Sequence, residues 1–390
     1  MSKKKILIDF FSSNPLTNVL EYKSLEPDFI YLLINEKDPG NIRAEHLRET
    51  VISWGRKVTF SITRIKEHRL SEIEEIIKEI IENELRFDNT IYIDLTGGDA
   101  LMIAAGFRVS EQYERSRVIP VILDPKSRSL TSVIDERNIC SLKDLSLDDY
   151  FMARGAKRFK NDTYRPLKKD HEDIIALGEH IFRMPKEWNK LNRMINHTAV
   201  NDSLDFELPD SISVNGENIS FSDSMQFLTD KFKEAGFISP LGNRRYRFRD
   251  KHVRSYMSKY GNWLEMYIFI KALEIFDDAY LSVEIDWDSA DIDHTDNEID
   301  VIAISNSVPV FISCKMRDIS NYDVYEIGHI ADRLNARAVI ATTSVIDPSS
   351  SKGKSLYSKL KSMDVGLITT EDLLDPTQDN EKLFKQPYII

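Results

Sequence analysis

The stretch NEIDVIAISNSVPVFISCK, residues 297–315, decides the fold of the last third of the chain. Its two apolar runs are separated by Asn306 and Ser307, which is typical of two strands joined by a tight turn. A two-residue hairpin would pair Ser305 with Val308. The register of the whole strand pair then follows by counting outward from the turn.

Counted in this way, Asp300 faces Ser313 on the neighbouring strand. Opposite partners share a face of the sheet, and side chains along a strand alternate between faces. We therefore expect Asp300, Ser313 and Lys315 on one side of the sheet. Cys314 should point away from them, into the core.

The segments around this hairpin indicate a helix–three strands–helix–strand order. An apolar helix is expected at GNWLEMYIFIKALEIF (261–276) and a strand at YLSVEIDW (280–287). After the hairpin, DVYEIGHIADRLNA (323–336) has helical spacing and ARAVIATT (336–343) reads as a strand. A last helix is expected near Ser355.

A carboxylate and a lysine held together at strand ends suit phosphodiester hydrolysis. The carboxylate binds a divalent cation, and the lysine orients or deprotonates the attacking water. Glu265 is the natural second carboxylate, because an acidic side chain on a largely apolar helix needs a partner or a metal. The residues alone leave another interpretation open, in which Asp300 and Lys315 form a plain ion pair and Glu265 faces solvent.

The N-terminal part predicts a Rossmann-like domain, because short β-rich apolar runs alternate with helix-length amphipathic segments up to about Pro125. Within it, IYIDLTGGDALMIAAGF (91–107) places Thr96, Gly97, Gly98 and Asp99 between a strand and a helix. Backbone N–H groups there favour a phosphate. Asp99 as a helix N-cap and the glycines as a tight turn are the alternative.

The middle of the chain predicts a connector of paired helices followed by a winged-helix-like end. SISVNGENISFS (211–222) contains Asn-Gly between alternating residues, a hairpin signal. The strand RRYRFRD (244–250) alternates arginines with aromatic rings, as a single-strand nucleic-acid channel does. A basic edge strand that avoids aggregation is equally compatible with it. The candidate nucleic-acid contacts are Arg245, Arg247 and Arg249.

Length and composition limit the remaining choices. At 390 residues the chain exceeds one hydrophobic core, and we expect domains at 1–145, 146–255 and 256–390. Two cysteines exclude a disulfide framework and fit the cytoplasm. No stretch of about 18 apolar residues occurs, so no membrane span is expected. The net charge of -12 argues against general attraction to nucleic acid, although a local basic surface can still serve.

Taken together, these motifs resemble a family of type III CRISPR ancillary nucleases. The order Glu265, Asp300, Ser313-x-Lys315 is similar to the PD-(D/E)xK restriction-endonuclease-like pattern, with Ser313 where the family usually has glutamate. The loop at 96–99 resembles the nucleotide-sensing loop of the CARF domain. The resemblance implies an α/β chain with a CARF sensor domain, a helical and winged-helix-like connector and a C-terminal nuclease domain.

The resemblance also implies a mechanism and its ligands. A homodimer would bind a cyclic oligoadenylate, most simply cyclic tetra-adenylate, and then cleave single-stranded RNA or DNA or duplex DNA with Mn²⁺ or Mg²⁺. Glu265, Asp300 and the backbone carbonyl of Ser313 are the implied metal ligands, and Lys315 positions the nucleophile. The implied activator contacts are Ser12, Ser13, Asn14, Thr96, Gly97, Gly98, Asp99 and Met102.

Two other functions fit the same sequence. A ligand-responsive nucleic-acid-binding regulator would use the winged-helix-like region at 222–250, with Ser313 marking an inactive nuclease core. A ring nuclease would degrade the activator in the CARF pocket. Sequence-specific duplex binding without cleavage indicates the regulator. Loss of the cyclic nucleotide that is unaffected by Lys315→Ala indicates the ring nuclease.

Overall fold

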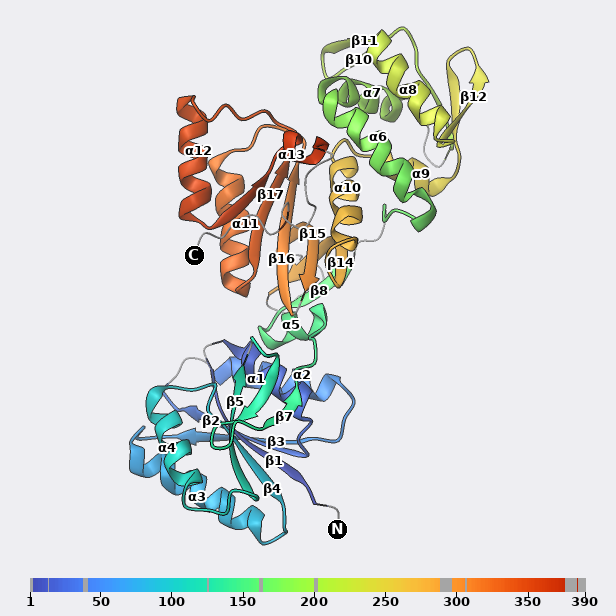
Figure 1. Cartoon of the computed structure of the whole chain (residues 1–390). Coiled ribbons are helices and arrows are strands. Elements are labelled where there is room, and N and C mark those ends of the chain that lie inside the picture. The colour runs from blue at the N-terminus through green and yellow to red at the C-terminus, as the bar shows by residue number, and fades with distance from the viewer. Residues whose placement is uncertain are drawn as a thin grey trace. The chain divides into compact units, whose positions relative to one another are not determined.

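The computed structural model describes residues 3–12, 14–37, 41–124, 126–160, 164–199, 203–287, 297–305, 307–375 and 384. The chain forms two compact units, which are described separately (Figure 1). The first consists mainly of Met1–Arg158. The second consists mainly of Phe159–Ile285 and Thr295–Ile390.

The first unit is built on a seven-stranded sheet of Rossmann-like order. Five strands are parallel, and two short antiparallel strands extend one edge. This confirms the predicted parallel sheet. In spatial order the strands are β3 (Thr59–Ile65), β2 (Phe29–Asn35), β1 (Lys5–Phe10), β4 (Thr90–Asp94), β5 (Val118–Asp124), β6 (Ser129–Ser132) and β7 (Asn138–Ser141).

Helices cover both faces of this sheet (Figure 1). The isoleucines of the helix predicted at 71–85 are buried at helical spacing, so its apolar face packs on the sheet. One face carries α3 (Leu70–Leu85) and α4 (Ala100–Ser110), and the other carries α1 (Pro15–Leu25), α2 (Asn41–Ser53) and α5 (Leu147–Ala153).

The strand order reverses between β1 and β4, because the chain runs outward from β1 to β3 on one side and from β4 to β5 on the other. Ligands of open α/β sheets bind outside the carboxyl ends of the strands at such a point. Phe10 ends β1 and Asp94 ends β4. The two predicted sensor loops therefore leave the sheet side by side.

The second unit contains a six-stranded sheet whose centre is the predicted hairpin. Ser305 pairs with Val308 and Val301 with Ile312, which confirms the register. Ser307 has φ 65°, as the tight turn requires, and Asn306 lies outside the described residues. In spatial order the strands are β18 (Val365–Ile368), β17 (Arg337–Thr342), β16 (Val308–Lys315), β15 (Asn297–Ser305), β14 (Asp278–Asp286) and β8 (Lys157–Lys160).

Two helices flank this sheet on opposite faces (Figure 1). α10 (Asn262–Leu273) packs against a core that includes Val301, Ile312 and Cys314, so Cys314 points inward as predicted. Both cysteines are free thiols: Cys314 is buried and Cys140, on β7, is half-buried. The predicted helix–three strands–helix–strand order is confirmed, with α11 (Asn321–Leu334) as its second helix, and it continues into α12 (Ser351–Ser362), β18 and α13 (Thr370–Leu374).

The rest of the second unit is the predicted connector of helices and short hairpins. Asn215 and Gly216 have φ 52° and 80°, which confirms the turn expected from their sequence. No helix in the described part of the chain is long and apolar enough to span a bilayer. The elements are η1 (Lys168–Asp170), α6 (His171–Arg183), α7 (Pro185–Thr198), β9 (Asp205–Glu207), β10 (Ser211–Val214), β11 (Glu217–Ser220), α8 (Asp223–Glu234), β12 (Ile238–Gly242), β13 (Arg245–Phe248) and α9 (Lys251–Tyr256).

Candidate nuclease centre and sensor loops

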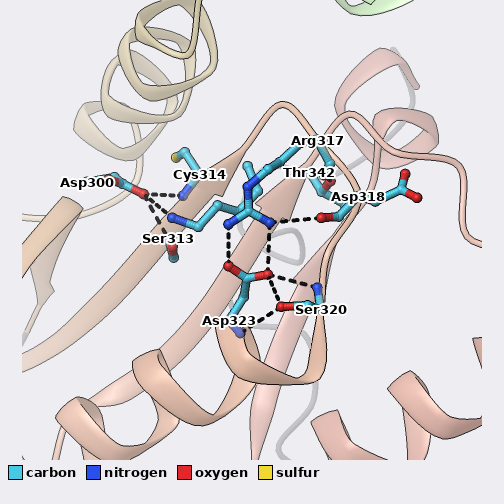
Figure 2. Close-up of polar contacts among 9 residues, drawn as sticks. Asp300, Ser313, Cys314, Arg317, Asp318, Ser320, Asp323 and Thr342 are labelled. Carbon is cyan, nitrogen blue, oxygen red and sulfur yellow. Dashed lines mark hydrogen bonds and ion pairs between the residues drawn. The ribbon is translucent and has the colours of Figure 1, made fainter.

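The carboxylate of Asp300 is the centre of a group of polar contacts at the ends of β15 and β16 (Figure 2). Its Oδ2 accepts hydrogen bonds from the backbone N–H of Cys314 at 2.6 Å and from Ser313 Oγ at 3.3 Å. Lys315 Nζ lies 3.6 Å from the same oxygen. The hairpin register thus brings Asp300, Ser313 and Lys315 together. The contact between Asp300 and Lys315 is also compatible with the alternative interpretation, in which these two residues only form an ion pair.

Glu265 occupies the first turn of α10, where the helix dipole favours a negative charge. Its Oε1 lies over Gly261, only 3.2 Å from the place that a Cβ there would take, and the hydroxyl of Tyr164 donates to its Oε2. Burial, followed by repulsion from Asp300, raises the pKa of Glu265 to about 7. Glu265 therefore takes up protons near neutral pH unless a cation compensates its charge.

Glu298 adds a third acidic group to this region. It lies two residues before Asp300 on β15, so the two side chains share a face, and its Oε1 accepts from Ser282 Oγ at 2.6 Å. Burial is the main reason that the pKa of Asp300 is raised; Glu298 adds to the increase, while Lys315 opposes it. The acidic groups thus destabilise one another's charged forms.

Two of these residues were not predicted from the sequence. Glu298 could have been found, because the period of two from Asp300 places it on the same face. Tyr164 could not, since 101 residues separate it from Glu265 and no spacing rule connects them.

This set of ligands suits a hard divalent cation such as Mg²⁺ or Mn²⁺, which prefers carboxylate oxygens. A cation would also relieve the mutual repulsion that raises the pKa values of Glu265 and Asp300. Ser313, which replaces the glutamate of the resembled motif, donates its hydroxyl to Asp300. A metal contact through the Ser313 carbonyl stays a prediction.

The chain immediately after Lys315 is fixed by two anchors. Arg317 makes a two-pronged contact with the buried carboxylate of Asp323, with Nη2–Oδ1 at 2.6 Å and Nη1–Oδ2 at 3.0 Å (Figure 2). Asp323 also completes the capping box of α11 with Ser320. The Tyr260 hydroxyl donates to the carbonyl of Met316 at 2.7 Å. These contacts hold the end of β16, and with it the backbone of Lys315.

In the first unit, the loop after β1 is tied to the start of α1. Asn14 is the N-cap of α1, and its Oδ1 also accepts from Arg154 Nη2 at 2.9 Å. The backbone N–H of Asn14 donates to Ser12 Oγ at 3.1 Å. Ser13 lies outside the described residues. Arg154 is a basic group at this loop that the sequence analysis missed.

The loop after β4 is a tight turn followed by a capped helix. Asp94 accepts the backbone N–H groups of Thr96 and Gly97 at 2.8 and 2.9 Å. Asp99 caps α4 by accepting from the N–H groups of Leu101 and Met102 at 2.9 and 3.1 Å. The N-cap and tight-turn reading therefore describes this loop, and an activator would have to use the polar groups that these bonds leave open.

The two sensor loops touch each other at the switch point of the sheet. Gly98 has φ 80°, and a Cβ on it would lie 2.6 Å from the Cβ of Phe10. A Cβ on Gly97 would lie 2.6 Å from the carbonyl of Phe10. His68 Nε2, another unpredicted neighbour, lies 2.8 Å from Asp99 Oδ2. Glycine at these positions permits the close approach of the two loops.

The arginines predicted to bind nucleic acid are each paired with a carboxylate in the second unit. Arg245 pairs with Glu207 at 3.1 Å, Arg247 with Asp205 at 2.6 Å and Arg249 with Asp170 at 2.8 Å. β13 is the central strand of a three-stranded sheet, paired with β12 on one side and β9 on the other, so the alternative of a basic edge strand is wrong. Contact with nucleic acid stays a prediction, and a phosphate would have to compete with these carboxylates.

Fold and site together define an α/β protein in which a Rossmann-like unit is joined to a unit with a nuclease-type αβββαβ core. Residues 251–365 match a protein-family model described as the endonuclease domain of Card1-like proteins. A search of curated protein sequences gives no match.

Solved structures share the fold over nearly the whole chain. Protein VC1899 from Vibrio cholerae matches with TM-score 0.78 and 17% identity, covering 98% of each chain. Can2 from Sulfobacillus thermosulfidooxidans, in complex with cyclic tetra-adenylate, matches with TM-score 0.63 and 17% identity over 98% of this chain and 95% of that one. A type III CRISPR defence DNA nuclease activated by cyclic oligoadenylate matches with TM-score 0.53 and 14% identity, over 90% of this chain and 48% of that one.

The predicted resemblance to CARF–nuclease ancillary proteins of type III CRISPR systems is therefore confirmed at the level of fold, and residues 251–365 resemble a Card1-like endonuclease domain.

Proposed function

We propose that this protein is a nuclease that depends on a divalent metal ion and is activated by a cyclic oligoadenylate in type III CRISPR defence. The proposal rests chiefly on the convergence of Asp300, Lys315 and Glu265 at one end of the β15–β16 hairpin and α10. The match of residues 251–365 to an endonuclease domain supports the same activity.

In this mechanism Asp300 and Glu265 would hold Mn²⁺ or Mg²⁺, and Glu298 would add negative charge beside them. Such an ion would supply Lewis-acid polarisation of the scissile phosphate. Lys315 orients the attacking water toward the phosphorus. The Cys314 amide and Ser313 hydroxyl keep the Asp300 carboxylate in place through their bonds to Oδ2.

Activation would begin in the first unit. A homodimer would bind cyclic tetra-adenylate at the paired loops after β1 and β4, and each subunit would contact one half of the ring. The complex of Can2 with cyclic tetra-adenylate supports this choice of ligand. Arg154 beside Asn14 could supply positive charge to the phosphates.

The experiment is a cleavage assay with labelled single-stranded RNA, single-stranded DNA and duplex DNA, with and without Mn²⁺ and cyclic tetra-adenylate. We expect cleavage that requires both the metal and the activator and is lost in Asp300→Asn. The matched control is Asp318→Asn, because Asp318 lies nearby and its side chain is 78% exposed. Equal cleavage by wild type and Asp300→Asn would refute the proposal.

A further inference from the structure

Three carboxyl groups meet inside the first unit, away from the nuclease centre. Asp9 on β1, Glu21 on α1 and Asp94 on β4 have exposed fractions of 0%, 1% and 2%. One oxygen from each lies within 4.8 Å of the others. Three buried carboxyls at this separation cannot all stay charged without compensation.

The hydrogen bonds around this cluster leave two oxygens without partners. Asp9 Oδ2 accepts from Asn18 Nδ2 at 2.8 Å and from the Tyr22 hydroxyl. Both oxygens of Asp94 accept backbone N–H groups of the sensor loop. Asp9 Oδ1 and Glu21 Oε1, by contrast, are buried and have no hydrogen-bond partner.

In the part of the chain that the structure describes, no basic side chain balances the cluster. Among the described residues, neither Asp9, Glu21 nor Asp94 forms an ion pair with a lysine, arginine or histidine. Neutralisation must therefore come from protons or from a bound cation.

Burial raises the pKa values of all three carboxyls, so without a cation the cluster takes up protons. The hydrogen bonds act in the opposite direction. Asn18, Tyr22 and the loop amides all donate to Asp9 or Asp94, and donors stabilise the ionised form of a carboxylate. The two oxygens without partners are hard ligands of the kind that Mg²⁺, Mn²⁺ and Ca²⁺ bind. One divalent cation would satisfy both oxygens and cancel most of the charge.

We propose that Asp9, Glu21 and Asp94 form a second divalent-cation site within the sensor unit. The site does not depend on the proposed nuclease activity. Asp94 holds the backbone of Thr96 and Gly97 directly, so a cation at this site would fix the loop and remove negative charge from beneath it. A polyanionic ligand could then approach that loop without repulsion from the cluster.

The test measures Mn²⁺ binding to the full chain after chelator treatment and equilibrium dialysis, by metal analysis and by electron paramagnetic resonance. The double variant Glu265→Gln/Asp300→Asn removes two carboxylates of the nuclease centre, so the remaining Mn²⁺ reports on the new site. We expect about one Mn²⁺ per chain in this background. Adding Glu21→Gln should weaken binding at least about tenfold, whereas the control Glu49→Gln should not, because the side chain of Glu49 is 67% exposed.

Folding is checked by circular dichroism, and Asp9→Asn serves as the second variant if Glu21→Gln does not fold. Independently of these variants, Mn²⁺ should raise the Tm of the double variant, because a ligand that binds only the folded state stabilises it. Absence of both bound Mn²⁺ and a Tm increase in the double variant would overturn the proposal in favour of proton sharing. Unchanged Mn²⁺ affinity in folded Glu21→Gln or Asp9→Asn would also overturn it.

Discussion

The hydrogen bonds of Asp300 converge on one of its two oxygens. The Cys314 amide, the Ser313 hydroxyl and the Lys315 ammonium all approach Oδ2. Among the described residues, no partner of Oδ1 is found, so that oxygen can bind a metal while Oδ2 stays anchored. The serine at position 313 is therefore compatible with metal binding by Asp300, because its hydroxyl bonds only Oδ2 and leaves Oδ1 open.

Substitutions at these positions should therefore differ in severity. We expect Asp300→Asn and Lys315→Ala to lower kcat by about 10²–10³-fold, because each removes a charge that acts on the reacting phosphate. Ser313→Ala should cost less than about tenfold, because the shorter Cys314 hydrogen bond remains. Steady-state cleavage rates check this order. A Ser313→Ala loss as large as that of Asp300→Asn would contradict it.

Tyr164 should act by positioning Glu265. Tyr164→Phe removes the hydroxyl that donates to Glu265, and the loss of such a bond costs about 1–2 kcal/mol, or about 5–30-fold in Mn²⁺ affinity. The Mn²⁺ dependence of cleavage measures this change. The control is Tyr322→Phe, because Tyr322 is 71% exposed. If both variants need the same Mn²⁺ concentration as wild type, Tyr164 does not position Glu265.

At the residue scale, the sequence was sufficient to predict which side chains lie together wherever the register of a strand pair could be counted. Asp300, Ser313 and Lys315 follow from the position of one turn, because the period of a strand is fixed. The partners of Arg245, Arg247 and Arg249 did not follow, since their carboxylates lie on β9 and η1. Such pairing depends on tertiary packing, which no local pattern encodes.

At the scale of elements, Gly98 in the loop after β4 can be compared with Gly55, which follows α2 and also has a positive φ. Gly98 and Gly55 have φ 80° and 68°, but only Gly98 is crowded by Phe10. Alanine at either position pays about 1 kcal/mol for the left-handed backbone. Gly98→Ala should cost about 1–3 kcal/mol more through overpacking and should weaken binding of cyclic tetra-adenylate. Urea unfolding and calorimetric titration of both variants test this, and equal effects at the two sites would contradict it.

The contact between Arg317 and Asp323 should make stability depend on pH. Burial opposes ionisation of Asp323, but Arg317 and Ser320 outweigh it and lower the pKa of Asp323 to about 2 from its ordinary 3.8. A lowered folded-state pKa stabilises the protein above about pH 4, and this contribution is lost as the pH falls toward 2. Arg317→Ala should therefore destabilise by about 1–2 kcal/mol at pH 7 and by much less at pH 2, where about half of the folded chains carry a protonated Asp323.

Urea unfolding at the two pH values measures the effect of Arg317→Ala. Lys352→Ala is the control, because Lys352 and Asp318 form an ion pair with side chains 72% and 78% exposed, which should contribute under about 1 kcal/mol. An Arg317→Ala effect that is the same at pH 7 and pH 2 would show that the charge of Asp323 is not its cause.

Elements were easier to predict than the contacts between them. Alternating and helical spacings identified the central hairpin, α3 and α10, because each buries one face of regular geometry. The anchoring of β16 through Tyr260 and Arg317 was not predicted. Tyr260 lies 56 residues before Met316, and Arg317 lies in the irregular segment between β16 and α11, so periodicity carries no information about either contact.

At the scale of the whole molecule, the proposed homodimer predicts a definite stoichiometry. A two-fold symmetric pair of sensor loops should bind one cyclic tetra-adenylate ring per two chains. Isothermal titration gives this ratio, and sedimentation velocity gives the mass with and without the ligand. One ring per chain, or a monomer that binds the ring fully, would contradict the symmetric arrangement.

The order of domains was predictable because each half carries its own pattern: alternating strands and helices with a glycine turn in the first, and a counted hairpin in the second. The division of the chain into two compact units was harder to predict. Most of the predicted connector belongs to the same compact unit as the nuclease-type core. The shared apolar core of α6, α7, α8 and α10 joins them, and this is a property of packing rather than of local composition.

The two thiols differ in their surroundings, so a spectroscopic label can be attached selectively to one of them in the natural chain. Burial raises the pKa of Cys314 far above its usual value, which keeps it from reacting with maleimides while the protein stays folded. Burial raises the pKa of Cys140 as well, but less, and its side chain on β7 is only half-buried, so Cys140 is the preferred attachment point for a fluorophore or spin label. A dye pair placed there, one on each copy of the proposed homodimer, would follow any rearrangement between the two Rossmann-like units in real time without a single engineered residue.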